Sequence, residues 1–169
     1  VTIGQAHSHG NAVFVFPGQG AQWVAMGQEL LTDSSVFAAT VAACDVALHP
    51  HTGWSVTDVL NGAQDAPSME QVDVIQPALF AMAIALAATW RSLGVEPSAV
   101  VGHSQGEIAA AVVAGALSSE EGAKIVALRS QLVKSRLAGL GGMAVVEMPV
   151  EVVSKGLAEP GLALSIAVV

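Results

Sequence analysis

The stretch that decides the fold is SAVVGHSQGEIAAAVVA, residues 98–114. Its first residues, 98–101, predict a short strand, GHSQG predicts a tight turn, and the small residues 107–114 predict a helix. A serine between two glycines at a strand-to-helix turn is typical of a nucleophile elbow, in which the hydroxyl projects over the sheet edge. The alternative is an ordinary turn with a capping serine. The pattern favours an α/β fold with Ser104 as nucleophile and the backbone N–H of Gln105 directed to a developing oxyanion.

A second glycine-containing turn follows another apolar run. The run is AVFVF at 12–16, and the turn is PGQGAQ at 17–22. Backbone N–H groups of such a turn can converge on an anionic oxygen opposite Gln105. A nucleotide site is not predicted, because the third glycine of a dinucleotide fingerprint and the acidic residue after the next strand are missing. The alternative is a tight turn without a chemical role.

Arg129 lies in a helix that is predicted to begin with a capping box at Ser118 and to end near Leu137. At about 100° per residue, Arg129 falls within the apolar arc of this helix, which predicts that it lies on the buried side. The arc is formed by Ile125, Leu128, Leu132 and Val133. A buried guanidinium needs a partner, and its planar fork suits a carboxylate such as that of a substrate. The alternatives are an internal ion pair and a side chain that snorkels to the rim.

The remaining patterns predict further helices and a second strand–helix–strand unit. The expected ranges are a helix over 23–31, a helix from Asp33 or Ser34 to Leu48, a loop-rich stretch to Val72, a helix from Pro77 to Leu93, a strand at 143–148, a helix after Pro149 and a strand at 163–169. Pro77 is placed at the first helical position because its missing N–H needs no partner there. His49–Pro50 is expected to end the earlier helix, because the residue before a proline disfavours helical backbone.

Composition narrows the classes of function. Of the 169 residues, 53% are hydrophobic and 12% are charged, which excludes a disordered chain and suggests that part of the surface is covered by neighbouring domains. The net charge of −8 argues against nucleic-acid binding. The single cysteine, Cys44, forms no internal disulfide, and no Cys/His spacing resembles a zinc site, so a metal-free cytoplasmic protein is expected. The uncharged stretch 74–90 is too short to span a membrane and is interpreted as a buried core helix.

Together, these motifs resemble the acyltransferase domain of modular type I polyketide synthases, a relative of malonyl-CoA:acyl carrier protein transacylase. The matching stretches are VFVFPGQGAQ at 13–22, VDVIQP at 72–77, GHSQG at 102–106 and Arg129. The resemblance implies a linker tail over 1–11 and an incomplete α/β-hydrolase-like large subdomain over 12–141. It implies the start of a ferredoxin-like small subdomain over 142–169.

The resemblance also implies a site and a reaction. Ser104 corresponds to the nucleophile, the backbone amides of Gln19 and Gln105 to the oxyanion hole, and Arg129 to the group that pairs with the free carboxylate of the extender unit. Gln76 matches a family glutamine near the substrate pocket and is assigned, with Arg129, to substrate binding. In that family the serine takes an acyl group from coenzyme A and passes it to the phosphopantetheine thiol of an acyl carrier protein, without a tightly bound cofactor. The implied partners are methylmalonyl-CoA or malonyl-CoA, the carrier protein and adjacent ketosynthase and linker domains, with no nucleic acid or membrane.

The segment QVDVIQP, residues 71–77, bears on the choice of extender unit. This segment, with Gln105 after the nucleophile, resembles the pattern of domains that use methylmalonyl-CoA. Gln71 departs from the arginine that is more usual at its position. The resemblance therefore favours methylmalonyl over malonyl.

The family's catalytic histidine has no match, because no histidine follows Ser104. The five histidines are His7 and His9 in the expected linker, His49 and His51, which are expected to face solvent, and His103. We expect His103 to point away from the nucleophile as a packing residue. The chain is accordingly expected to be the first part of a domain in a longer multidomain polypeptide, and inactive alone.

Two other functions share some of these features. A serine hydrolase, such as an esterase or thioesterase, has the same elbow but needs a downstream acid and histidine and has no use for Arg129. A non-catalytic scaffold fragment would carry Ser104 without its chemistry.

Overall fold

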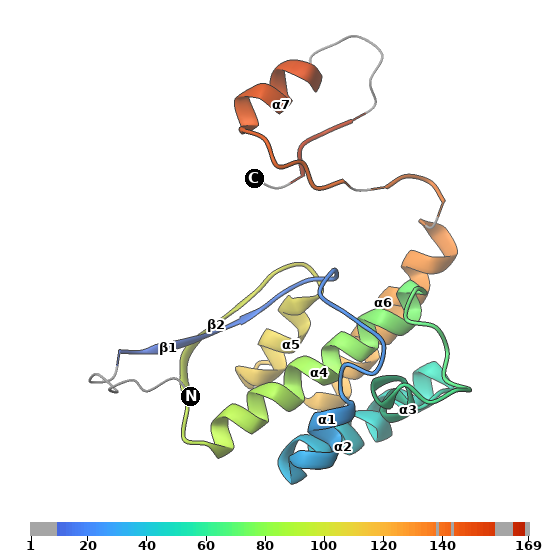
Figure 1. Cartoon of the computed structure of the whole chain (residues 1–169), viewed down its shortest axis with the longest axis vertical. Helices are drawn as coiled ribbons and strands as arrows, with labels where there is room; N and C mark the ends of the chain where they lie inside the picture. The colour runs from blue at the N-terminus through green and yellow to red at the C-terminus, as the bar shows by residue number, and fades with distance from the viewer. Residues whose placement is uncertain (1–9, 138, 143, 158–163, 168–169) are drawn as a thin grey trace. The chain divides into compact units, whose positions relative to one another are not determined.

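The computed structural model describes residues 10–137, 139–142, 144–157 and 164–167. The chain divides into two compact units, Val1–Ala138 and Gly139–Val169. Figure 1 shows the elements, which in chain order are β1 (Ala12–Phe16), α1 (Gln28–Asp33), α2 (Ser35–Thr52), α3 (Val56–Asn61), α4 (Val72–Ser92), β2 (Pro97–Gly102), α5 (Gly106–Val113), α6 (Ser119–Arg136) and α7 (Val150–Leu157). Most of the expected linker, 1–11, lies outside the described residues.

The two strands of the first unit pair in parallel, so the predicted α/β class and both predicted strands are confirmed. Phe14 lies opposite Val100, and Phe16 opposite Gly102. A parallel pair needs a long crossover, which α1 to α4 supply. The sheet's covered face packs on α5 and contributes Phe16 to the core. The hydrolase-like description of this unit goes beyond these two strands and stays a prediction.

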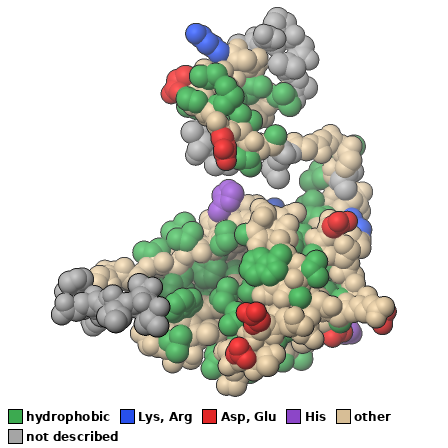
Figure 2. All heavy atoms as spheres, in the orientation of Figure 1, with side chains coloured by type: hydrophobic (Ala, Val, Ile, Leu, Met, Phe, Trp, Pro, Cys, Tyr) green, Lys and Arg blue, Asp and Glu red, His purple; other side chains and the backbone are tan. Residues whose placement is uncertain are grey.

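The opposite face of the sheet is exposed. Val13, Val15 and Val101 keep 49%, 67% and 54% of their surface accessible. Parallel strands are normally buried on both faces, so this exposure is unusual. Figure 2 shows apolar side chains at many points on the surface, as the low proportion of charged residues led us to expect.

The long helix α4 lies at the centre of the first unit and packs against α2, α3, α5 and α6. Its length and composition alone would allow it to cross a membrane. Its side chains Val74, Phe80, Ala81 and Ile84 instead belong to the hydrophobic core. The expectation that this stretch is too short to span a membrane is wrong, because its helix has 21 residues. The interpretation of 74–90 as a buried core helix is confirmed.

Two prolines stand inside helices, where the sequence predicted boundaries. The expectation that Pro77 starts its helix is wrong, because α4 begins at Val72. Burial of Val74 and Ile75 favours helix on the N-terminal side of the proline and outweighs one missing backbone hydrogen bond. The expected helix end at His49–Pro50 is also wrong, since α2 continues to Thr52 and is capped by Gly53 in the left-handed conformation. 

Between the two glycine turns, the helices differ from the expected ranges. Residues 23–27 are not helical, 24–27 form turns, and α1 begins only at Gln28. The stretch expected to be loop contains α3, for which the Ser55 N-cap and the left-handed Gly62 were available signals.

The predicted capping box at the start of α6 is confirmed. Ser118 Oγ accepts from the N–H of Glu121 at 3.1 Å.

In the second unit, the helix predicted after Pro149 is present as α7. The strand predictions at 143–148 and 163–169 are wrong for the described residues 144–148 and 164–167, which form no strand. A strand requires a hydrogen-bonded neighbour, and the described residues of this unit supply none. Met143, Ala163 and residues 168–169 lie outside the described residues. The small-subdomain assignment stays a prediction.

Cys44 is buried in α2 and is the free cysteine of the chain. Burial, and to a smaller extent the charge of Asp45, raises the pKa of its thiol to about 12. The reactive form of cysteine is the thiolate, so Cys44 is an inert core residue near neutral pH.

Asp45 joins α2 to the start of α3. Its carboxylate accepts hydrogen bonds from Ser55 Oγ at 2.7 Å, Val56 N–H at 2.7 Å and Thr57 Oγ1 at 3.2 Å. We expect Asp45→Ala to lower the free energy of unfolding by about 2–3 kcal/mol, because it leaves these partly buried donors without a partner. Urea denaturation measures this, with the exposed Asp65→Ala as control. Equal stability of the two variants would contradict the bridging role.

Candidate active site

The GHSQG segment forms a sharp elbow between β2 and α5. Ser104 has φ of 55°, in the left-handed region that residues other than glycine rarely adopt. The N–H of Gly106 donates to the carbonyl of His103 at 2.9 Å, and that of Glu107 to Ser104 at 3.1 Å, which closes the turn. Ser104 is an exposed residue. The elbow predicted from the sequence is thus present, with a strained, accessible serine at its tip.

The glycines on either side of Ser104 leave room for this turn. A Cβ on Gly102 would lie 2.5 Å from the backbone nitrogen of Glu107. A Cβ on Gly106 would lie 2.6 Å from the carbonyl oxygen of Pro17 and closer still to that of Phe16. Every one of these atoms belongs to the backbone, Glu107 in α5 and Phe16 and Pro17 at the end of β1, so a side chain at either position would force the backbone to shift and both positions favour glycine.

The PGQGAQ turn lies directly against the elbow. The N–H of His103 donates to the carbonyl of Phe16 at 2.9 Å, which continues the pairing of the strands into the turns. A Cβ on Gly18 would be 3.5 Å from Ser104 Cβ, so the backbone of this turn passes close beside Ser104. Gln22 Oε1 accepts from the N–H of Gly20 at 2.8 Å and stabilises the turn. Segments far apart in the sequence therefore meet at Ser104.

The amides assigned to the oxyanion hole are available as donors. Neither the N–H of Gln19 nor that of Gln105 donates to any residue that the structure describes. Gln105 also stands immediately before α5, where the helix dipole favours negative charge. Unpaired backbone donors beside a nucleophile suit the stabilisation of a tetrahedral oxyanion. Convergence of the two amides on one point stays a prediction.

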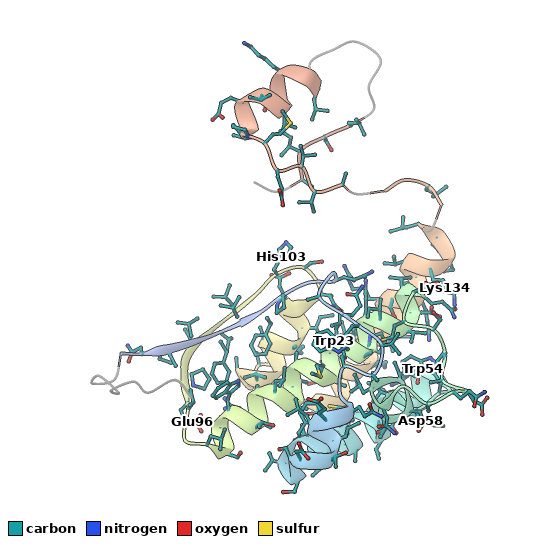
Figure 3. All side chains as sticks on the ribbon, viewed as in Figure 1. Trp23, Trp54, Asp58, Glu96, His103 and Lys134 are labelled. Atoms are coloured by element: carbon teal, nitrogen blue, oxygen red, sulfur yellow. The ribbon has the colours of Figure 1, made fainter. Side chains whose placement is uncertain are left out.

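The two side chains that flank Ser104, those of His103 and Gln105, differ in burial. Gln105 is buried, and its Oε1 has no hydrogen-bond partner among the described residues. His103 is exposed, and Figure 3 shows it projecting outward from the connection between β2 and α5. The expectation that His103 is a packing residue is wrong, because the elbow turns it toward solvent.

Arg129 lies on the exposed side of α6, so its predicted burial is wrong. The buried side of α6 consists of small residues that allow close packing against α2 and α4, namely Gly122, Ala123, Val126, Ala127 and Ser130. The predicted apolar arc is instead exposed, with Ile125, Leu128 and Leu132 at 42%, 43% and 56%. The guanidinium Nη1 donates to Oε1 of Gln76 at 2.7 Å. Arg129 and Gln76 are thus together, 53 positions apart in the sequence.

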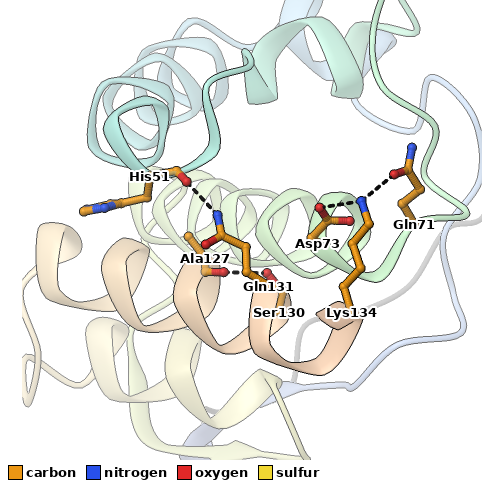
Figure 4. Close-up of polar contacts among 7 residues, drawn as sticks. All are labelled: His51, Gln71, Asp73, Ala127, Ser130, Gln131 and Lys134. Carbon is orange, nitrogen blue, oxygen red and sulfur yellow. Dashed lines mark hydrogen bonds and ion pairs between the residues drawn. The ribbon is translucent and has the colours of Figure 1, made fainter. Parts of the chain in front are cut away.

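A second contact between α4 and α6 was missed by the sequence analysis. Lys134 Nζ lies 2.8 Å from Asp73 Oδ2 and 2.7 Å from Gln71 Oε1 (Figure 4). The acidic residue in the first turn of α4 and the basic residue in the last turn of α6 each favour their helix dipole. The places of Asp73 and Lys134 at these helix ends were the signal in the sequence that could have indicated the contact. Lys134 therefore holds the start of the QVDVIQP segment.

The sequence matches the acyl transferase domain family model over residues 13–168. The spectinabilin polyketide synthase system protein NorC of Streptomyces orinoci is 59% identical over 149 residues, which are 88% of this chain and 7% of that protein. Among solved structures, a loading acyltransferase from the avermectin modular polyketide synthase is 57% identical, with a TM-score of 0.72 over 73% of this chain and 39% of that one.

A more distant structure points to the same family. The malonyl-CoA:ACP transacylase of Synechocystis sp. PCC 6803 is 32% identical, with a TM-score of 0.63 over 74% of this chain and 40% of that one. The chain thus spans well under half of these solved proteins and a small part of the synthase protein. With an elbow serine, an adjacent glycine turn and a family match over most of its length, the chain belongs to the acyl transferase domain family.

Proposed function

We propose that this chain forms part of a polyketide synthase acyltransferase that loads a methylmalonyl extender unit. Ser104 Oγ attacks the thioester carbonyl of methylmalonyl-CoA, the carbon–sulfur bond breaks, and coenzyme A leaves as its thiol. The phosphopantetheine thiol of an acyl carrier protein then attacks the acyl-serine ester and releases Ser104. The observation that carries the proposal is the glycine turn lying against Ser104 with unpaired amides on both sides of it.

The remaining roles follow from the chemistry of the substrate. A methylmalonyl thioester has a reactive carbonyl at one end and a carboxylate at the other. The amides of Gln19 and Gln105 would stabilise the oxyanion, and Arg129 would pair with the carboxylate. Among the described residues Arg129 forms no ion pair, which leaves its charge free for substrate. The histidine that the resemblance assigns as the base has no counterpart after Ser104 in this sequence.

The extender choice and the partners rest on sequence resemblance. QVDVIQP at 71–77 and Gln105 favour methylmalonyl over malonyl. An acyl carrier protein, neighbouring ketosynthase and linker domains and a cytoplasmic location are part of the same proposal. A tightly bound cofactor is not required by the reaction.

Intact mass measurement tests the proposal. The full-length polypeptide that contains this sequence is exposed briefly to equimolar malonyl-CoA and methylmalonyl-CoA, and the adduct is located by peptide mapping. A methylmalonyl adduct on Ser104 supports the whole proposal. A malonyl adduct supports acyl transfer and overturns the extender assignment, whereas a folded protein without an adduct contradicts the catalytic role.

Arg129→Ala separates an acyltransferase from a serine hydrolase. We expect kcat/KM for methylmalonyl-CoA to fall by about 10²–10³-fold, because a charged hydrogen-bonded pair with the carboxylate is lost. The value for propionyl-CoA, which lacks the carboxylate, should change little. Arg136→Ala, at the exposed end of the same helix, is the control. Unchanged selectivity in Arg129→Ala would favour a hydrolase.

A further inference from the structure

Gln76 is the partner of the Arg129 guanidinium in this structure. The Nη1–Oε1 distance is 2.7 Å, which is a short hydrogen bond from a charged donor. Only 7% of Gln76 is accessible, whereas Arg129 is an exposed residue. The bond therefore joins a long, exposed side chain with many rotamers to a buried acceptor.

The position of Gln76 is strongly constrained by its neighbours on α4. Ile75 and Ala78 are completely buried, and Pro77, whose ring fixes its own backbone angle, follows directly. An arginine side chain loses rotamer entropy when it is held in one conformation. An acceptor that is already rigid restricts Arg129 before any substrate arrives, so less of this cost falls on substrate binding.

The acceptor Gln76 is also neutral. In the ion pairs of this structure, by contrast, the cation contacts a charged carboxylate. The ion pairs among the described residues are Arg91 with Glu96 and Lys134 with Asp73. Asp73 lies three residues before Gln76 on the same side of α4, and its Oδ2 is taken by Lys134 at 2.8 Å (Figure 4). Arg129 is thus held by an amide while the nearby acid is paired with another cation.

We propose that Gln76 is a positioning residue that orients Arg129 without neutralising it. The carbonyl of its amide fixes one nitrogen of the guanidinium, and the remaining N–H groups and the full positive charge stay free for the carboxylate of an acyl substrate. This inference rests on the proposed function and replaces direct substrate binding by Gln76, which the family resemblance implied. It makes selectivity for carboxylate-bearing acyl groups depend on a residue that acts through Arg129.

Two substitutions test the positioning role in the full-length polypeptide. The readouts are kcat and KM for methylmalonyl-CoA and for propionyl-CoA, which differ by the free carboxylate. Gln76→Leu should lower kcat/KM for methylmalonyl-CoA about ten- to a hundredfold, mainly through KM, with little change for propionyl-CoA. Gln76→Glu keeps the shape and the acceptor but adds a charge that pairs with Arg129, so it should lower the methylmalonyl value at least as much. Gln131→Leu is the matched control, since Gln131 Nε2 makes a 2.7 Å bond to the carbonyl of His51.

The outcomes are distinguishable from failure of the proposed function. If wild-type protein forms no acyl-serine, the proposed function itself fails. If the acyl-serine forms and both Gln76 variants keep the wild-type ratio of the two substrates, the positioning role is wrong. An equal loss for both substrates would also overturn it, because it would indicate a general structural effect. Should Gln76→Leu fail to fold, the isosteric Gln76→Glu variant carries the test.

Discussion

Ser104→Ala is expected to lower the rate of acyl transfer by about 10⁶-fold. Without the hydroxyl no acyl-serine forms, and only the oxyanion donors and substrate binding remain to accelerate direct attack by another nucleophile. The measurement is the rate of acyl transfer from the CoA thioester to the carrier protein, together with the mass of the protein after exposure to methylmalonyl-CoA.

Ser118→Ala is a suitable control for this substitution. It removes a serine hydroxyl from the N-cap of α6, so it should lower the free energy of unfolding by about 1 kcal/mol and leave the rate unchanged. Transfer at the wild-type rate in Ser104→Ala would show that another group is the nucleophile. A large rate loss in Ser118→Ala would show that the assay reports stability.

Gly106→Ala is expected to have the largest effect on the fold. The added Cβ would lie 2.6 Å from the carbonyl oxygen of Pro17 and closer to that of Phe16, and both are backbone atoms at the point where the two turns meet. Relief requires β1 to move away from the elbow, which breaks the contact between His103 N–H and Phe16. We expect a loss of about 4 kcal/mol or more in the free energy of unfolding, which is enough to unfold many domains.

Gly141→Ala is the matched control, because nothing lies within 4 Å of a Cβ at that position. Urea denaturation should give the same midpoint for this variant as for the wild type. A Gly106→Ala protein with wild-type stability and activity would show that the two turns are not held together as the structure indicates.

The site could be predicted from sequence where its chemistry is local. An elbow needs a strand, a helix and glycines around one serine within a few residues, and GHSQG contains all of these between β2 and α5. The glycine turn after β1 could be identified for the same reason. The sequence analysis placed this turn opposite Gln105 as an expectation. Its contact with Ser104 is seen only in the structure, because it depends on the register of two strands more than eighty residues apart.

Helix boundaries and the environment of Arg129 were less predictable. Pro77 and Pro50 lie inside α4 and α2, since tertiary burial of the adjacent turns outweighs the lost hydrogen bond. The face of α6 was assigned from hydrophobicity, yet its buried side is a stripe of small residues such as Ala123 and Ala127. Close approach of helices selects for small volume as well as for apolar character, so an arc of large side chains need not be the buried one.

The sequence by itself therefore determined the α/β class and the elbow with Ser104 at its tip, because each depends on short runs of residues adjacent in the chain. The family resemblance followed from the sequence as well, because each of its motifs is such a short run or a single residue at a fixed spacing. Only the tertiary structure decided which side of α6 faces the core, that Gln76 holds Arg129, and that Lys134 occupies Asp73. These contacts join α4 to α6 across more than fifty residues, and their geometry follows from how closely the two helices pack.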